Sequence, residues 1–241
     1  MTVRTLFLGL CLSLILIGLA VTGYSTINQL ACEGQPINNN ESPTVEQQIY
    51  GERLIGQSFV APHNYLNQIS LMFQTYQRRN THDVTLRLLE IPADTANPFE
   101  GIERFSTTFN ASTLRDKSWR DFVIPEIADS SGKTYLIVLA SPESVSGDAI
   151  TVGGIERNVY LPGTAYLGPV PVPADFAFRT CYQMSLTEKI HILTQQMTHN
   201  RPGVWGNSTF YGLTILLYAA VIVLFFGLMV RLIVEDNKKA K

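Results

Sequence analysis

The chain has 241 residues, of which 18 are Lys or Arg and 20 are Asp or Glu, so its formal net charge is −2. Between Glu33 and Arg201 there are 18 acidic and 13 basic side chains, which excludes the basic surface that nucleic-acid binding requires. The hydrophobic fraction of 46% is raised by two apolar runs, one near each end of the chain. About 180 residues remain between them, enough for one domain with a substantial core.

The first apolar run, Leu6 to Thr22, predicts an N-terminal transmembrane anchor over residues 1–24. A cleaved secretory signal, with Arg4 as its charged region, is the alternative. The apolar run is longer than the core of an ordinary signal and no A-x-A site closes it, so we favour an uncleaved anchor. Residues 25–46 are predicted to be a linker, because Glu33 to Glu46 is polar and contains proline.

Residues 47–184 show the period-two alternation that is typical of half-buried strands. The alternating apolar positions are Ile69, Leu71 and Phe73 in one run and Val84, Leu86 and Leu88 in the next. The polar QRRNTHD between these runs is expected to form a hairpin-like loop, and KTYLIVLA, which is apolar on both faces, a central strand. No helix-period segment interrupts the strands, so we predict a mainly β domain, an antiparallel β-sandwich of the jelly-roll type.

A short amphipathic helix is predicted at residues 185–203. Ser185 and Glu188 have the spacing of a capping box. An apolar stripe at helical spacing follows, formed by Leu186, Ile190, Leu193 and Met197. We expect this helix to lie close to the membrane, and a helix packed wholly on the β-sandwich is the alternative.

A C-terminal transmembrane helix is predicted over residues 204–234, because Phe210 to Val230 contains no charge and reaches roughly 31 Å at about 1.5 Å per residue. Arg231 and the lysines of the tail at 235–241 follow this run, and Arg4 precedes the first one. Lys and Arg close to a span tend to remain in the cytoplasm. Both termini are therefore predicted to be cytoplasmic, and the domain between the two spans extracytoplasmic.

The three cysteines differ in their positions. Cys11 lies in the first apolar run, whereas Cys32 and Cys181 lie between the spans. An oxidising compartment would allow these two to form a disulfide, which we predict. Two unrelated thiols are the alternative, because the sequence does not fix the distance between their Cα atoms.

Three segments between Gly56 and Tyr182, TYQRRNTHD, DSSGKTYLIVLASPES and DFAFR, resemble the extracytoplasmic jelly-roll domain of bacterial envelope glycosyltransferase-type and uncharacterised membrane proteins. That domain is similar in outline to carbohydrate-binding modules. The resemblance implies a jelly-roll fold in the cell envelope. The polytopic catalytic half of such proteins is missing from this chain, which implies an accessory or partner protein.

Motifs for catalysis are missing from the sequence: it has no G-x-S-x-G, H-E-x-x-H, P-loop or C-x-x-C. We therefore predict a protein without catalytic residues. Sugars are bound by aromatic faces and by planar polar groups. Loop residues of these types give the candidate ligand-binding set Tyr76, Arg78, Arg79, Asn80, His82, Asp83, Tyr160 and Tyr166. The alternative for Arg78 and Asp83 is that they brace the loop.

No cofactor is required by the sequence, but Ca²⁺ is the candidate metal, with Asp129 and Asp175 as candidate ligands. The alternative for Asp175 is a hydrogen bond to the backbone at the start of the last strand. Trp119 alternates with Phe122 and is expected to belong to the core.

Two functions from different classes follow. The first is a non-catalytic, membrane-anchored envelope protein whose outer β-sandwich binds glycan or a glycan-handling membrane partner. The alternative is a structural or accessory subunit of a larger membrane protein complex, in which the spans pack against other helices. Both include the lipid bilayer as a partner and neither includes nucleic acid.

Overall fold

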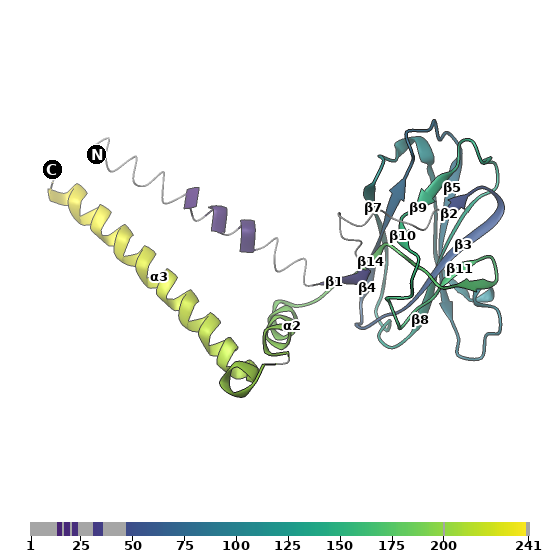
Figure 1. The fold of residues 1–241 in the computed structure, drawn as a ribbon. Helices are drawn as coiled ribbons and strands as arrows, with labels where there is room; N and C mark the ends of the chain where they lie inside the picture. Colours follow the sequence, from purple (N-terminus) through teal and green to yellow (C-terminus); the bar gives the residue numbers. More distant parts are fainter. Residues whose placement is uncertain are drawn as a thin grey trace. The chain divides into compact units, whose positions relative to one another are not determined.

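The computed structural model describes residues 14–15, 17–19, 21–23, 31–35, 47–199 and 201–239. The chain divides into two compact units: Cys32–Gln183 is one, and Met1–Ala31 together with Met184–Lys241 is the other. We call the first unit the β-domain and the second the helical unit (Figure 1). All strands of the described residues belong to the β-domain.

The β-domain consists of strands and two short 3-10 helices, η1 (Pro98–Glu100) and η2 (Ala111–Thr113). The longer strands are β3 (Gly51–Val60), β4 (Leu66–Gln74), β5 (Asp83–Ile91), β6 (Ile102–Asn110), β7 (Ser118–Ile127), β8 (Thr134–Ser141) and β14 (Phe178–Tyr182). The shorter ones are β1 (Cys32–Gln35), β2 (Gln47–Ile49), β9 (Ile150–Val152), β10 (Gly154–Ile155), β11 (Ala165–Leu167), β12 (Val170–Val172) and β13 (Asp175–Phe176).

Within the described residues the strands form two six-stranded sheets and one small pair. The first sheet has the order β1-β14-β4-β9-β2, with β7 paired to the other edge of β4, and the second has the order β12-β11-β3-β8-β5-β6. Strands β10 and β13 form the small pair. Every pairing is antiparallel, so the prediction of a mainly β, antiparallel domain is confirmed, while the jelly-roll type stays a prediction.

The core lies between the two sheets. All six alternating apolar positions that the sequence singles out in β4 and β5 are buried. Aromatic rings connect the layers: the ring centroids of Phe59 in β3 and Phe178 in β14 are 5.8 Å apart, and those of Phe73 in β4 and Phe109 in β6 are 5.6 Å apart. Strand β8 lies between β3 and β5, as its apolar residues on both faces predict.

The segment 75–82 is not a hairpin loop, contrary to the prediction. It joins β4 of the first sheet to β5 of the second, so it crosses from one layer to the other. The physical reason is that both strands place their apolar faces in the same core from opposite sides, and strands that face each other across a core do not pair.

The predicted linker at 25–46 is also partly wrong, because its residues Cys32–Gln35 form β1. This strand pairs with β14, and the register places Cys32 opposite Cys181. The two Sγ atoms are joined in a disulfide, with the Cα atoms 4.0 Å apart. Residues 36–46 lie outside the described residues.

The helical unit contains α2 (Leu186–Thr198), η3 (Gly203–Gly206) and α3 (Ser208–Lys239). Ser185 caps α2, and the capping box with Glu188 is present in both directions, so the predicted start of this helix is confirmed. The helix ends earlier than the predicted 203. That α2 lies close to the membrane, and the alternative that it packs on the β-sandwich, stay predictions.

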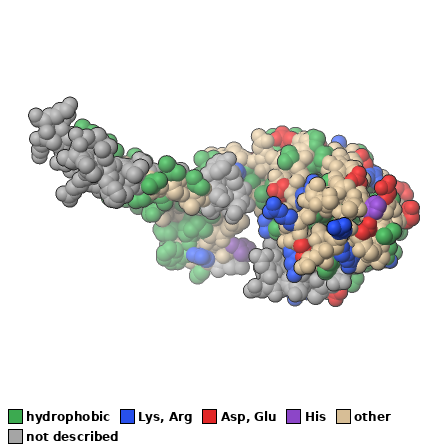
Figure 2. All heavy atoms as spheres, turned by 90° about the horizontal axis from the view of Figure 1, so that it is seen from above, with side chains coloured by type: hydrophobic (Ala, Val, Ile, Leu, Met, Phe, Trp, Pro, Cys, Tyr) green, Lys and Arg blue, Asp and Glu red, His purple; other side chains and the backbone are tan. Residues whose placement is uncertain are grey.

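Helix α3 contains the predicted C-terminal apolar run. Its segment Ser208–Arg231 has a mean hydropathy of 2.7 and is long and apolar enough to cross a membrane. In Figure 2 hydrophobic side chains gather over the helical unit, whereas charged side chains are spread over the β-domain. Among the described residues this is the only helix with that length and composition. The prediction of a first span over 1–24 falls largely outside the described residues.

Candidate functional site

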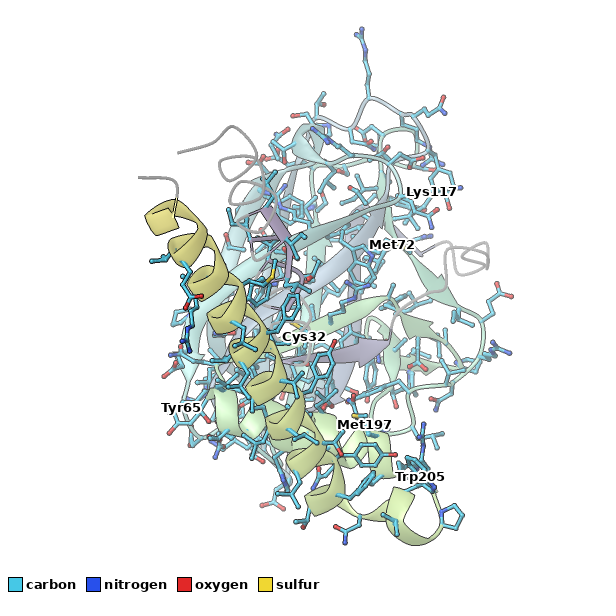
Figure 3. The ribbon with its side chains drawn as sticks, turned by 90° about the vertical axis from the view of Figure 1, so that its left-hand side faces the viewer. Cys32, Tyr65, Met72, Lys117, Met197 and Trp205 are labelled. Carbon is cyan, nitrogen blue, oxygen red and sulfur yellow. A yellow bond between two sulfur atoms is a disulfide. The ribbon has the colours of Figure 1, made fainter. Side chains whose placement is uncertain are left out.

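Three loops meet at one end of the β-domain: 75–82, 111–117 and 142–149. The strand registers place these loops together. In the first sheet the end of β4 pairs with the start of β7. In the second sheet the start of β5 pairs with the ends of β6 and β8. Backbone and side-chain hydrogen bonds also join the loops to one another. We call this the distal loop surface, because the chain enters and leaves the domain at the other end, at Cys32 and Gln183. Figure 3 labels Lys117 on this surface and Tyr65 at the opposite end.

A hollow of about 450 Å³ opens on the distal loop surface. Pockets for small ligands occupy roughly 300–1,000 Å³, so this volume is in the range for one or two sugar rings. Its lining residues come from two loops, and most of them have polar side chains: Thr75, Arg78, Arg79, Asn80, Thr81, Ala111, Ser112 and Leu114. Three of the predicted ligand-binding residues, Arg78, Arg79 and Asn80, therefore share one cavity.

Several predicted residues brace this surface through the loop 142–149. Arg78 donates to the carbonyl oxygens of Ser146 and Ala149 at 3.4 and 3.3 Å, and the buried Asn80 donates its amide to the carbonyl oxygen of Asp148. His82 Nε2 lies 2.9 Å from a carboxylate oxygen of Asp148. Loops whose side chains bond carbonyls of a neighbouring loop hold a fixed shape, so the hollow is preformed.

The loop 75–82 is also fixed by Asp116 from the neighbouring loop. One carboxylate oxygen of Asp116 accepts the N–H groups of Thr75 and Tyr76 at 2.7 and 3.0 Å. Partial burial opposes ionisation of Asp116, but these hydrogen bonds outweigh it and hold the pKa of the carboxyl below its ordinary value. Tyr76 and Gln77 have φ angles of 52° and 58°, in the left-handed region that side chains other than glycine rarely adopt. Such backbone persists where the surroundings fix it, and it gathers at binding sites.

Arg79 differs from its neighbour Arg78. Its side chain is exposed, lines the hollow and makes no hydrogen bond or ion pair with the described residues. Asp83, by contrast, accepts a hydrogen bond from the amide of Asn110 at 2.8 Å and supports the start of β5. Arg78 and Asp83 thus have the bracing positions that the sequence leaves open as an alternative, whereas Arg79 is exposed.

The two predicted tyrosines outside these loops do not join the site. Tyr160 packs edge-on against Phe178, with the ring centroids 5.1 Å apart, and donates its hydroxyl to the carbonyl oxygen of Val60. Burial raises the pKa of the Tyr160 hydroxyl. Tyr166 packs edge-on against Phe99 in a separate apolar cluster on the second sheet. Nothing in the local sequence distinguishes such packed tyrosines from exposed ones.

A second polar and aromatic surface, which the sequence does not single out, lies on the outer face of the first sheet. Trp119 in β7 is only half-buried and packs on Met72 and Ala177. It therefore lies outside the core between the sheets, contrary to the prediction. The guanidinium of Arg179 lies over the Trp119 ring, 4.1 Å from its centroid. Asp121 accepts a hydrogen bond from Ser70 on the same face at 2.6 Å. Because Arg179 covers the ring face on which a sugar would stack, we rank this surface below the distal loop surface.

Comparisons with known proteins add little to this picture. No family model matches the chain, and no curated protein matches it. A solved structure to which it is similar contains the cysteine protease and lectin-like domains of Cwp84, a surface layer associated protein of Clostridium difficile. The TM-score is 0.39 and the identity 7%, over 55% of this chain and 32% of that one, so this chain spans about a third of that structure.

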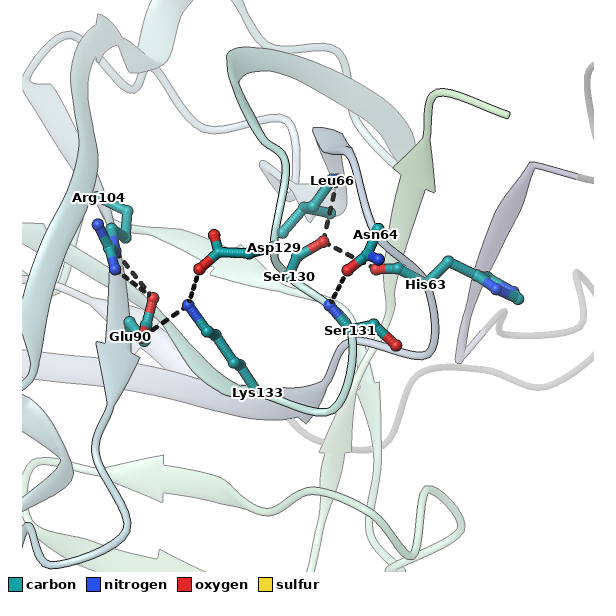
Figure 4. Close-up of polar contacts among 9 residues, drawn as sticks. All are labelled: His63, Asn64, Leu66, Glu90, Arg104, Asp129, Ser130, Ser131 and Lys133. Atoms are coloured by element: carbon teal, nitrogen blue, oxygen red, sulfur yellow. Dashed lines mark hydrogen bonds and ion pairs between the residues drawn. The ribbon is translucent and has the colours of Figure 1, made fainter. Parts of the chain in front are cut away.

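The two candidate Ca²⁺ ligands lie apart and have other partners. Asp129 pairs with Lys133 at 2.6 Å, and Lys133 also lies 3.4 Å from Glu90, in the turn between β7 and β8 (Figure 4). This contact with Lys133 lowers the pKa of Asp129. The carboxylate of Asp175 is fully buried and accepts the N–H groups of Val159 and Tyr160, so the backbone alternative for Asp175 agrees with the structure. No group of three or more possible metal ligands occurs in the described part of the chain.

Proposed function

We propose that the chain is a non-catalytic, membrane-anchored protein whose β-domain binds glycan at the distal loop surface. The observation that carries this proposal is the hollow of about 450 Å³, lined by arginine, asparagine, threonine and serine residues on braced loops. Planar polar groups of this kind match sugar hydroxyls. Loops held on a rigid sandwich are also where binding sites are commonly built.

The anchor is the second part of the proposal. The apolar segment Ser208–Arg231 of α3 supports one span, and the apolar run Leu6 to Thr22 supports another. The positive charges of Arg4, Arg231 and the C-terminal lysines favour cytoplasmic termini. The β-domain between the spans would then lie outside the cytoplasm, where its disulfide is stable.

Labelling in sealed cells tests this topology. In a Cys11→Ser background, Lys239→Cys is expected to be protected from a membrane-impermeant maleimide, and Asn39→Cys is expected to react. Protection of Asn39→Cys together with labelling of Lys239→Cys would reverse the orientation and contradict the proposal. Labelling after detergent lysis serves as the control that both introduced thiols are reactive.

Glycan binding is tested with the full chain in nanodiscs of neutral lipid, applied to an array of bacterial envelope, plant and animal glycans. We expect retention on a subset of the array, and retention should persist when Phe210 to Val230 is replaced by an unrelated apolar helix. Absence of binding to every glycan would contradict the proposal. A membrane partner that co-purifies with the native chain and is lost on this helix replacement would instead support an accessory subunit.

A further inference from the structure

We propose that the hollow on the distal loop surface selects a negatively charged glycan, and that Arg79 binds the anionic group of the sugar. This inference rests on the proposed function and specifies its ligand class. The ligand would be a sugar ring that carries an oxyanion, which can be a carboxylate or a phosphate.

Charge distribution is the first support. The β-domain as a whole is acidic, with 17 acidic and 11 basic side chains between Cys32 and Gln183. The three loops of the distal loop surface differ from this average, because they hold four basic residues, Arg78, Arg79, Arg115 and Lys117, against three acidic ones, Asp116, Glu143 and Asp148. The two loops that line the hollow hold all four of these basic residues and one acidic residue, Asp116. A small positive balance at this place in an acidic domain favours an anionic ligand.

The carboxylates close to this surface are already engaged. Asp116 is held by the N–H groups of Thr75 and Tyr76, and Asp83 by the amide of Asn110. In the loop 142–149, Asp148 lies 2.9 Å from His82 and the exposed Glu143 lies 3.8 Å from it. None of these contacts involves Arg79, which leaves the Arg79 guanidinium available to a ligand.

The two adjacent arginines have different roles. Arg78 is occupied by two backbone carbonyl oxygens and lies over the Tyr76 ring at 5.1 Å, so it is a positioning residue. Arg79 follows directly on the same turn, is exposed and also lines the hollow. A guanidinium presents a planar pair of donors that binds carboxylate or phosphate through two parallel hydrogen bonds.

The hollow also offers neutral groups for the rest of the sugar. Thr75, Thr81 and Ser112 line it together with Ala111 and Leu114. The hydroxyls of Thr75 and Ser112 donate to Asp116 and Asn110, and their oxygens can still accept a hydrogen bond. At the start of β7, Arg120 donates to the hydroxyl of Thr113, next to the lining residues Ser112 and Leu114, and lies over the Phe109 ring. The hollow therefore combines arginines with uncharged residues, as an anionic sugar requires.

The test measures binding of the full chain, in nanodiscs of neutral lipid, to two matched pairs of polymers. Polygalacturonate and its methyl ester differ in the carboxylate, which esterification makes neutral, and phosphomannan and the same mannan after dephosphorylation differ in the phosphate. We expect at least one charged polymer to bind more than tenfold tighter than its neutral counterpart. The preference should fall as salt is raised, because an exposed ion pair is screened.

Arg79→Gln is expected to weaken binding of the preferred charged polymer about tenfold, which corresponds to about 1.4 kcal/mol, and to leave binding of the neutral counterpart unchanged. Lys133→Gln, which removes one positive charge at the opposite end of the domain, is the matched control and should bind like the native chain. Because Arg79 is exposed, its replacement should leave the thermal midpoint unchanged.

Each outcome bears on a different claim. Equal binding to charged and neutral polymers would overturn the anionic selectivity but leave the proposed function in place. A charge preference that Arg79→Gln does not reduce would overturn the role of Arg79. Absence of binding to these polymers and to the whole glycan array would contradict the proposed function itself.

Discussion

Replacing both Cys32 and Cys181 by serine is expected to lower the free energy of unfolding of the β-domain by about 4–5 kcal/mol. The disulfide closes a loop with a sequence separation of 149 residues, which includes nearly the whole domain. Without it the unfolded chain gains the conformational freedom that loop closure removes. Strand β1 also loses its covalent tie to β14, and its four residues are then held by their pairing with β14.

Urea unfolding of the full chain in detergent micelles measures this effect. The chain has two tryptophans, so a Trp205→Phe background leaves Trp119 in β7 as the fluorescent reporter of the β-domain. Cys11→Ser is the control and should leave the unfolding midpoint unchanged. A loss below about 1 kcal/mol in the double serine variant would show that the core alone carries the stability, since loop closure of this length predicts several times more.

Phe73→Ala is expected to lower the free energy of unfolding by about 3–5 kcal/mol. Phe73 in β4 is fully buried, and its ring contacts Phe109 from the second sheet and Phe122 from the first. Its removal opens a cavity between the two layers, because the flanking strands are fixed by their ladders and cannot close the gap fully.

The same unfolding measurement tests this substitution, with Val123→Ala as the control. Val123 lies in β7 on the outer face and is 75% exposed, so its truncation should change the stability by less than about 0.5 kcal/mol. If Phe73→Ala had as little effect as Val123→Ala, the Phe73, Phe109 and Phe122 contacts would not form part of the core.

Elements with a strong local signal were predictable from the sequence. The period-two positions of β4 and β5 are buried as expected, and the capping box starts α2 at Leu186. Helix α3 contains the apolar run that the sequence marks as a span. In each case the signal is the periodicity of the side chains or a helix cap, which involves about ten neighbouring residues. Such an element can be predicted without knowing its contacts with distant parts of the chain.

The candidate site was predictable only in part. The composition of 75–82 points to a polar loop with arginines, and that loop does line a cavity. Arg78 braces the loop and Arg79 does not, because Arg78 donates to the carbonyl oxygens of Ser146 and Ala149, about 70 residues further along the chain. Asp116 and Ser112 join the site from a third segment, and no spacing rule connects them with Arg79.

The sequence by itself determined the antiparallel β character, the apolar segment of α3 and the acidic balance of the domain, because periodicity and composition are local properties. Only the tertiary structure decided which sheet each strand joins, that 75–82 crosses between sheets, and that Cys32–Gln35 forms a strand against β14. It also decided that Trp119 packs outside the core. These features depend on pairing between segments up to about 150 residues apart, where many arrangements satisfy the same local pattern and the contacts of the whole fold select one.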